Sequence, residues 1–314
     1  MNRRTFLATC AFAATMAGPA HAAGDKLTVM LDWFVNPDHA PLVVAKALGL
    51  FVEAGLDVEL VPPADPSSVP RLVAAAQADI GVYYQPNLYL DHEAGVPIMR
   101  FGTLIETPLN TVIALADGPV RNLADLKGRT VGYSVSGFED ALLAEMLASV
   151  GLKLSDVKLV NVNFALSPSL MSGRVDAVVG GYRNFELIQM RLDGHPGRAF
   201  YPEEHGVPPY DELIYVTRPA LAKDSRLPRF LQAAEKAALY LTNHPDEAWK
   251  MFAAAHSDLD NPLNKAAWAA TLPRFSKSPA EFDEERYTRF ADFLVRRGVI
   301  KSAPAMADIV VATG

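Results

Sequence analysis

The chain has 314 residues, a formal net charge of −7 and a hydrophobic fraction of 50%. This acidic balance gives no electrostatic reason to expect binding to nucleic acid or to an anionic membrane surface. The single cysteine, Cys10, lies close to the N-terminus, so the rest of the chain predicts neither disulfide bonds nor thiolate chemistry. The length suits one large domain or two lobes with a sizeable core.

The N-terminal segment has the features of a cleavable export signal. Arg3 and Arg4 precede small and apolar residues that end at Ala20-His21-Ala22, which fits a signal-peptidase site. The order Arg-Arg-Thr-Phe-Leu also resembles a twin-arginine signal. We therefore expect residues 1–22 to be removed near Ala22 and the remaining protein to be periplasmic. The alternatives are a lipoprotein signal at Cys10 and a membrane anchor, although the apolar run is shorter than the roughly 20 residues that a span needs.

After this segment, strand patterns alternate with helix patterns along the chain. Short apolar or alternating runs predict strands, and apolar residues at helical spacing predict helices. The first round contains strands at 27–31, 56–61 and 80–83 and helices at 41–48 and 69–78. The second round contains strands at 130–133 and 157–162, a helix at 141–150 and the start of another at 168–173. This alternation favours βαβ units and a mostly parallel sheet.

A short internal echo indicates two similar lobes, with chance similarity as the alternative. Residues 73–82 and 170–179 each read as a helix end, an aspartate-bearing turn and an apolar strand. The segments that follow, 83–87 and 180–184, then lie at the carboxyl ends of strands, where open α/β sheets bind ligands. Two lobes that each present such an edge would face each other across a cleft.

From about Pro219 the sequence becomes helical. Amphipathic patterns cover residues 230–241, 245–255, 265–272 and 282–297. Their aromatic side chains are most simply core residues that pack on a lobe.

The densest group of candidate functional side chains follows the first strand. Asp32, Trp33, Asn36 and His39 bring a carboxylate, an indole, an amide and an imidazole into one short segment. A large aromatic face beside short polar groups suits a planar heterocycle, which stacks on the face and hydrogen-bonds at its edge. Trp33 as a core residue, and His39 as a helix cap or structural hydrogen-bond partner, remain alternatives. No metal site is predicted, because His39, Asp32 and Asp38 lack a recognisable ligand spacing.

Several short patterns occur in the order found in one known family. They are Asp32-Trp33, Pro37-x-His39, Gly49-Leu50-Phe51, Gly55-Leu56-Asp57-Val58, Asp79-Ile80-Gly81, Leu123-x-x-Leu126-Lys127-Gly128, Gly173-x-Val175-Asp176-Ala177 and Tyr182-x-Asn184-x-Glu186. This set, over about residues 26–218, resembles the solute-binding proteins of ABC importers in the thiamine-pyrimidine-precursor group. It is also similar to the fungal pyrimidine synthase of thiamine biosynthesis, which shares their fold. The resemblance implies an α/β, type II periplasmic binding protein, in which each lobe is a mixed, mostly parallel sheet flanked by helices.

The resemblance also implies roles for the polar and aromatic residues. We expect Trp33, with Tyr84 or Tyr182, to stack on a ring, and Asp32 and Glu186 to accept hydrogen bonds from ring amino groups. Asn184 would pair with a ring acceptor. Independently of the resemblance, Ser134-Val135-Ser136-Gly137 is a small-residue loop before a predicted helix that starts near Phe138. Its backbone donors suit a polar ligand group, with an ordinary helix cap as the alternative. The full set of candidate ligand-binding residues is Asp32, Trp33, Asn36, His39, Tyr84, Ser134, Ser136, Tyr182, Asn184 and Glu186.

A pyrimidine-synthesising enzyme is the alternative from another class. The synthase pattern has a lysine near the strand that corresponds to residues 80–82, and this chain has Tyr83 there. A histidine of the synthase corresponds to Asn87, and its cysteine-rich segment has no counterpart. Without a Schiff-base lysine or thiols that chemistry has no carriers, so we expect no enzyme activity and no cofactor.

The expected mechanism is closure of two lobes on a small heterocycle. Lobe one is predicted to span residues 23–115 and 214–314, and lobe two residues 116–213, with crossings near 115–120 and 213–216. The closed form, a monomer, would dock on an ABC permease in the membrane. The candidate ligands are hydroxymethylpyrimidine, its amino or formylamino relatives, thiamine and a riboflavin-like ring. Alkanesulfonate and nitrate are alternatives that would require arginine or free amides, and Arg183 keeps them open.

Overall fold

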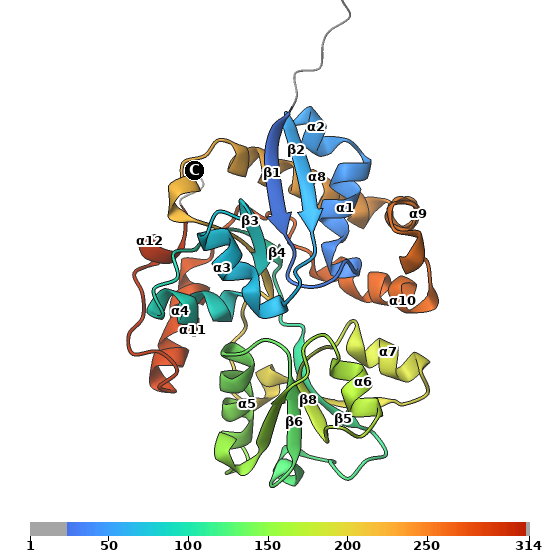
Figure 1. Cartoon of the computed structure of the whole chain (residues 1–314), viewed down its shortest axis with the longest axis vertical. Helices are drawn as coiled ribbons and strands as arrows, with labels where there is room; N and C mark the ends of the chain where they lie inside the picture. Colours follow the sequence, from blue (N-terminus) through green and yellow to red (C-terminus); the bar gives the residue numbers. More distant parts are fainter. Residues whose placement is uncertain (1–23, 312–314) are drawn as a thin grey trace, which may run out of the picture.

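The computed structural model describes residues 24–311, so the expected export signal lies outside the described residues. The molecule consists of two five-stranded sheets, one above the other in Figure 1, each with helices on its faces. Among the described helices, none has both the length and the apolar character that a bilayer crossing requires.

The sheet of the first lobe has the strand order β2-β1-β3-β10-β4. Strand β1 is parallel to β2 and β3, and β10 is antiparallel to β3 and β4. The bounds are β1 (Asp25–Met30), β2 (Leu56–Val61), β3 (Ile80–Tyr83), β4 (Met99–Ile105) and β10 (Leu213–Thr217). The helices between these strands are α1 (Ala40–Ala47), α2 (Leu50–Glu53), α3 (Val69–Ala74) and α4 (Gln85–Glu93).

The sheet of the second lobe has the order β7-β6-β8-β5-β9. Strand β6 is parallel to β7 and β8, and β5 is antiparallel to β8 and β9. The bounds are β5 (Asn110–Leu115), β6 (Thr130–Tyr133), β7 (Lys158–Asn161), β8 (Ala177–Tyr182) and β9 (Gly197–Phe200). Its helices are α5 (Phe138–Ala148), α6 (Leu166–Met171) and α7 (Glu186–Leu192).

The internal echo is confirmed by equivalent contacts in the two sheets. The Asp79 amide donates to the Thr28 carbonyl, and the Thr28 amide donates to the Asp79 carboxylate at 3.1 Å. Asp176 and Thr130 make the same pair of bonds, the second at 2.9 Å. Each aspartate thus fixes the start of a buried strand, β3 or β8, beside the first strand of its own lobe.

The predicted first crossing near residues 115–120 is wrong, because β5 belongs to the second sheet. The chain leaves the first sheet after β4 and has already crossed when β5 begins at Asn110. It returns before β10, which begins at Leu213, the predicted position. The apolar run of β5 fits either sheet, and its partners β8 and β9 lie later in the chain. In each sheet, the strand in the fourth position of the order, β10 or β5, is thus the first strand that forms after the chain crosses from the other lobe.

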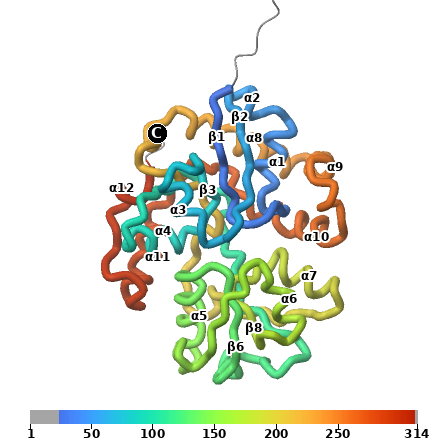
Figure 2. The backbone as a smooth tube through the Cα atoms, viewed as in Figure 1, coloured from blue at the N-terminus to red at the C-terminus, as the bar shows by residue number. Residues whose placement is uncertain are grey.

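The C-terminal helices pack around the first lobe, as predicted (Figure 2). They are α8 (Arg226–Asn243), α9 (Pro245–Ala255), α10 (Pro262–Thr271), α11 (Glu284–Arg296) and α12 (Met306–Ile309). Helix α8 lies against α1 and α2, where Phe230 stacks on Phe51 with ring centroids 5.4 Å apart. Helix α10 also contacts α7 of the second lobe, so this tail takes part in the interface between the lobes.

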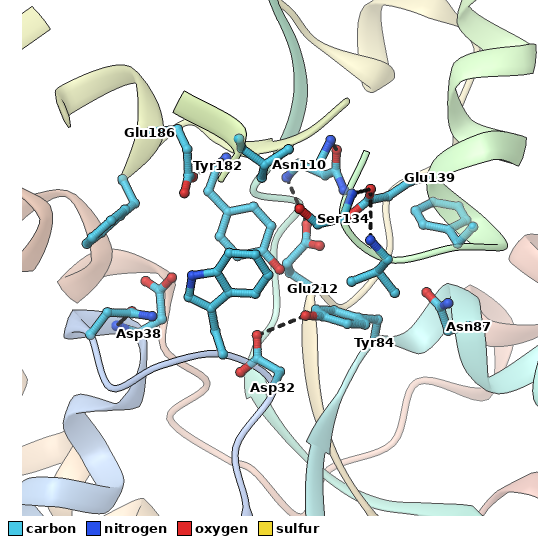
Figure 3. Close-up of a pocket in the computed structure, with 17 residues that line it drawn as sticks. Asp32, Asp38, Tyr84, Asn87, Asn110, Ser134, Glu139, Tyr182, Glu186 and Glu212 are labelled. Atoms are coloured by element: carbon cyan, nitrogen blue, oxygen red, sulfur yellow. Dashed lines mark hydrogen bonds between the residues drawn. The ribbon is translucent and has the colours of Figure 1, made fainter. Parts of the chain in front are cut away.

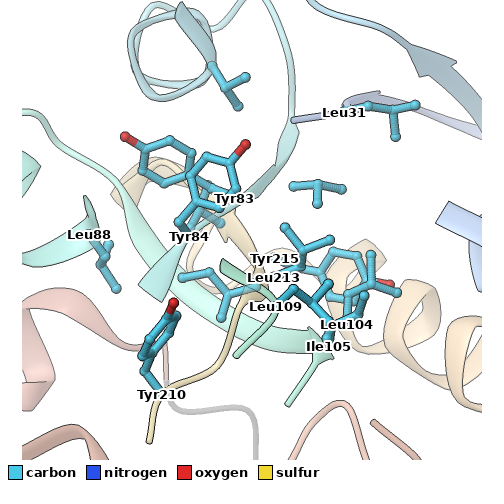
Figure 4. Packing of buried hydrophobic residues seen from close by; sticks show 14 of the residues in the cluster. Leu31, Tyr83, Tyr84, Leu88, Leu104, Ile105, Leu109, Tyr210, Leu213 and Tyr215 are labelled. Atoms are coloured by element: carbon cyan, nitrogen blue, oxygen red, sulfur yellow. The ribbon is translucent and has the colours of Figure 1, made fainter. Parts of the chain in front are cut away.

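The core of the first lobe extends to the edge that faces the second. Leu213 and Tyr215 of β10 lie beside Tyr83 and Tyr84 at the end of β3, and all four side chains are buried (Figure 4). The Tyr83 hydroxyl donates to Asp91 at 2.6 Å. This packing fixes the end of β3, where the site begins.

Candidate functional site

A pocket lies between the two lobes, at the carboxyl ends of their central strands (Figure 3). It contains about 570 Å³ of empty space, part of which is open to solvent. Its walls come from the segments that follow β1, β3, β6 and β8 and from the two crossing segments. The predicted edge is therefore where the pocket lies, and seven predicted residues line it: Asp32, Trp33, Asn36, Tyr84, Ser134, Tyr182 and Glu186.

Asp32 is held by two side chains of its own lobe. Its Oδ1 lies 2.8 Å from His39 Nε2, and its Oδ2 accepts from the Tyr84 hydroxyl at 3.1 Å. His39 Nδ1 accepts from the Asn36 amide at 3.3 Å, so the ring proton is on Nε2 and is donated to Asp32. His39 is completely buried and does not line the pocket. The structure therefore supports the alternative reading of His39 as a structural partner.

Trp33 lies between the lobes in the pocket wall. Its indole packs edge-on against Phe164 of the second lobe, with ring centroids 4.5 Å apart, and is only half-buried. Tyr182 and Tyr84 line the same space (Figure 3). With Phe138 and Phe185, five aromatic side chains thus line the space that a flat ring would fill.

Two carboxylates from the second lobe are held by backbone amides. Glu139, in the first turn of α5, accepts through Oε2 from the amides of Ser134 and Val135 at 2.9 and 3.2 Å. Glu186, at the start of α7, accepts through Oε2 from the Tyr182 amide at 2.7 Å. Each bond fixes one oxygen and leaves the other toward the pocket side.

Glu212 joins the two crossing segments. Its Oε2 accepts from the amides of Leu109 and Asn110 at 2.5 and 3.0 Å, and from the Tyr210 hydroxyl at 3.1 Å. Glu212 immediately precedes β10, and Asn110 begins β5. The carboxylate therefore ties together the strands that connect the lobes.

Five carboxyl side chains line the pocket, and none of its lining residues is lysine or arginine. Burial raises the pKa of Glu139 to about 8, and the pKa of both Glu186 and Glu212 to about 7. Burial also raises the pKa of Asp38 to about 6. Such a pocket attracts hydrogen-bond donors and cations and repels anions. The described residues hold no group of three or more His, Asp or Glu side chains arranged for a metal ion.

Asn184 was predicted to contact the ligand, but the structure places it outside the lining of the pocket. Its Nδ2 donates to Asp38 Oδ1 at 2.6 Å and to Thr271 Oγ1 at 2.7 Å, and the side chain is only 1% exposed. Asn184 follows β8 in the second lobe, whereas Asp38 and Thr271 belong to the first. The amide therefore bridges the lobes beside the pocket, through a threonine far along the chain that local sequence could not reveal.

The loop before α5 also differs from expectation. Ser136 does not line the pocket, and its carbonyl accepts from Asn87 of the first lobe at 3.3 Å. The Ser134 hydroxyl donates to the Asn163 carbonyl, and the Ser134 amide holds Glu139. The amides of Ser134 and Val135, two of the backbone donors that were expected to bind a ligand group, are thus occupied by Glu139.

Sequence reasoning missed ten lining residues. They are Asp38, Asn87, Asn110, Val135, Phe138, Glu139, Leu166, Gly180, Phe185 and Glu212. The position of Glu139 after a small-residue loop and in a first helical turn was a usable signal. No local sequence pattern indicated Glu212, because the amides that hold it, those of Leu109 and Asn110, come from the other crossing segment.

Comparison with known proteins places the chain in a family. The model of the NMT1/THI5-like family matches residues 36–248. A Haemophilus influenzae protein named for thiamine biosynthesis is 49% identical over 92% of this chain and 92% of its own length. The formylaminopyrimidine-binding protein of Halalkalibacterium halodurans is 35% identical over 82% of this chain and 78% of its own.

A solved structure shows the same fold at low sequence identity. The periplasmic aliphatic sulphonate binding protein SsuA of Escherichia coli superimposes with a TM-score of 0.70 at 15% identity. The superposition covers 91% of this chain and 97% of that protein. The chain therefore has the periplasmic binding protein fold and belongs to the NMT1/THI5-like family.

Proposed function

We propose that this protein is the extracytoplasmic receptor of an ABC importer and binds a thiamine pyrimidine precursor of the hydroxymethylpyrimidine or formylaminopyrimidine type. The lobes close on the ligand, and the closed form, a monomer without a cofactor, docks on the membrane permease. The observation that carries the proposal is an aromatic pocket with five carboxyl groups and no basic side chain. The named relative that binds formylaminopyrimidine supports the same ligand class.

An aminopyrimidine matches this pocket in shape and in hydrogen bonding. Its ring is flat and stacks on aromatic faces, and its amino group supplies N–H donors at the edge. Carboxylates only accept hydrogen bonds, so a donor-bearing edge satisfies them. A charge-assisted hydrogen bond of this kind contributes about 1.5–3 kcal/mol. Two such bonds with stacking are enough for a Kd of about 1 μM or below.

An alkanesulfonate or nitrate receptor is the competing binding function, and the site disfavours it. Arg183, the residue that kept this alternative open, pairs bidentately with Glu203, with contacts of 2.5 and 2.9 Å. Its guanidinium lies over the Tyr201 ring at 4.6 Å and does not line the pocket. The amides of Ser134 and Val135 are occupied by Glu139. An anion would therefore meet carboxylates without a compensating basic side chain.

An enzyme of the pyrimidine-synthase type is disfavoured by the residue at the expected lysine position. Tyr83 is buried and donates to Asp91, away from the pocket. Schiff-base chemistry requires an amine, and no lysine is among the lining residues.

Thermal unfolding with a ligand panel tests the proposal. The panel contains 4-amino-5-hydroxymethyl-2-methylpyrimidine, its formylaminomethyl relative, thiamine, riboflavin, an alkanesulfonate, nitrate and pyridoxal phosphate. We expect the melting temperature to rise with the logarithm of the excess of a pyrimidine precursor, because only the folded state binds it. X-ray scattering should show a more compact particle with that ligand. Stabilisation by the sulfonate or nitrate alone, or a yellow adduct with pyridoxal phosphate, would overturn the proposal.

A further inference from the structure

Besides Asp32, the carboxyl groups of the pocket form two pairs, one on each side of it (Figure 3). Asp38 and Glu186 lie on one side, and Glu139 and Glu212 on the other. Besides burial, the charge of Asp38 raises the pKa of Glu186, and the charges of Asp140 and Glu212 raise the pKa of Glu139. The pocket therefore has two acidic ends, whereas the amino group of a simple aminopyrimidine satisfies only one.

The second pair is built to present free acceptors. Oε2 of Glu139 and Oε2 of Glu212 each accept from two consecutive backbone amides. No hydrogen bond within residues 24–311 reaches Oε1 of either side chain, and both residues are more than nine-tenths buried. Gly180 makes the room for one of them: a Cβ at this position would lie 2.4 Å from Glu139 Oε1.

We propose that Glu139 and Glu212 form a second recognition subsite, which binds a hydrogen-bond-donating substituent of the ligand: an amine, an amide N–H or a hydroxyl. The Asp38 and Glu186 pair then binds the amino edge of the ring. The ligand class is an aminopyrimidine that carries a donor group on the opposite side of the ring. This inference rests on the proposed function, since it assumes that the ring lies against Trp33.

The backbone amides make glutamine an informative substitution at both positions. In Glu139→Gln, the amides of Ser134 and Val135 still require an oxygen, so the side-chain NH₂ must take the place of Oε1. In Glu212→Gln, the amides of Leu109 and Asn110 impose the same orientation. Each variant therefore keeps its shape but opposes a ligand donor with a protein donor.

The test is titration calorimetry of the whole protein with three matched pyrimidines at about pH 9, above the pKa of about 8 for Glu139 and about 7 for Glu212, so that both side chains are ionised acceptors. Two carry a donor, the 5-hydroxymethyl and 5-aminomethyl forms of 4-amino-2-methylpyrimidine, and the third, 4-amino-2,5-dimethylpyrimidine, has none. We expect wild type to bind the donor-bearing forms at least about tenfold more tightly than the dimethyl form. Glu139→Gln and Glu212→Gln should each reduce this ratio to about twofold or less and change dimethyl binding by less than about threefold.

Asp140→Asn is the matched control, because Asp140 follows Glu139 on the same helix but does not line the pocket. In this variant, the ratio of the affinity for the donor-bearing pyrimidines to that for the dimethyl form should equal the wild-type ratio. Equal affinity of wild type for all three pyrimidines would overturn the subsite and leave the proposed function standing. A wild-type ratio in either glutamine variant, provided that this variant folds, would do the same. Absence of binding by every pyrimidine would overturn the proposed function as well.

Discussion

The two lobes share a strand order, yet they contribute different chemistry to the pocket. In the first lobe Asp32 is fixed by side chains, and both of its oxygens are engaged by His39 and Tyr84. In the second lobe Glu139 and Glu186 are fixed by backbone amides through one oxygen only. Duplication of the fold therefore determines where the site lies, and the residues after equivalent strands determine what it binds.

The difference assigns separate tasks to the lobes. The first lobe presents a preformed wall with Trp33 and with Tyr84, whose hydroxyl is bonded to Asp32, and adds Asp38 at the edge of the pocket. The second lobe presents carboxyl oxygens that still lack partners and acquire them from a ligand. Substitutions of Trp33, Tyr84 and Asp32 in the first lobe should thus affect stacking or stability, and those of Glu139 and Glu186 in the second should affect the choice of ligand.

The largest expected effect comes from Gly180, which allows Glu139 to reach the pocket. Gly180 has φ of +92°, and an added Cβ would clash with Glu139. We expect Gly180→Ala to lower the free energy of unfolding by about 1–3 kcal/mol and to reduce pyrimidine affinity by more than about tenfold. Urea unfolding and calorimetry measure the two effects.

Gly173→Ala is the matched control. Gly173 also has a positive φ, +72°, but nothing lies within 4 Å of its added Cβ. We expect Gly173→Ala to lower the free energy of unfolding through backbone strain but to bind pyrimidines with the wild-type affinity. Equal affinities of the two variants would show that the position of Glu139 does not matter for binding.

Removal of the stacking face should have the next largest effect. Trp33→Ala is expected to leave the fold intact and to weaken pyrimidine binding by about 1–3 kcal/mol, through loss of the aromatic contact and its burial. Phe34→Ala, which removes a neighbouring ring that does not line the pocket, should weaken binding by less than about threefold. Unchanged affinity in folded Trp33→Ala would leave this residue a structural role only.

Matched acid-to-amide changes compare the lobes directly. Glu186→Gln should lower pyrimidine affinity by about tenfold with little change in stability, since the oxygen bound to the Tyr182 amide is kept. Asp32→Asn should instead lower stability by about 1–3 kcal/mol, because one of the donors from His39 and Tyr84 then faces an NH₂ group. The reverse pattern, with Glu186→Gln as the destabilising variant, would contradict the assignment of tasks.

The pH dependence of stability follows from the raised pKa values. Folded Glu139, with a pKa of about 8, keeps its proton where an unfolded glutamate, at about 4.3, has lost it. Between about pH 5 and 8 the folded state thus binds more protons, so the free energy of unfolding contributed by this group falls as pH rises. Urea unfolding without ligand should show a smaller fall for Glu139→Gln than for wild type. If the free energy of unfolding fell equally with pH in both proteins, a group other than Glu139 would hold the proton.

The smallest expected effect concerns the bridge between the lobes. Asn184→Ala removes the bonds to Asp38 and Thr271 but leaves the bond of 2.9 Å between those two residues. We expect ligand affinity to fall by only about two- to fivefold, with a larger ligand-free particle in X-ray scattering. Loss of affinity with no change in the ligand-free particle would instead point to a direct ligand contact.

Sequence patterns predicted the parts of the fold that depend on neighbouring residues. The strands at Leu56–Val61 and Ile80–Tyr83 have the predicted bounds, because their alternating or continuous apolar runs end at clear turns. The membership of β5 could not be predicted, since its pairing partners lie far along the chain. The cluster after the first strand predicted Trp33 as a ligand contact, and the resemblance added Glu186. The roles of Glu212 and Asn184 depend on partners from other segments, which no local pattern indicates.

Titration calorimetry of the purified protein with 4-amino-5-hydroxymethyl-2-methylpyrimidine and with ethanesulfonate tests the central claim most directly. The pocket has acceptors for N–H donors and no basic side chain for an anion. We expect a Kd of about 1 μM or below for the pyrimidine, and no detectable heat with the sulfonate. Binding of the sulfonate at comparable affinity, without a response to the pyrimidine, would contradict it.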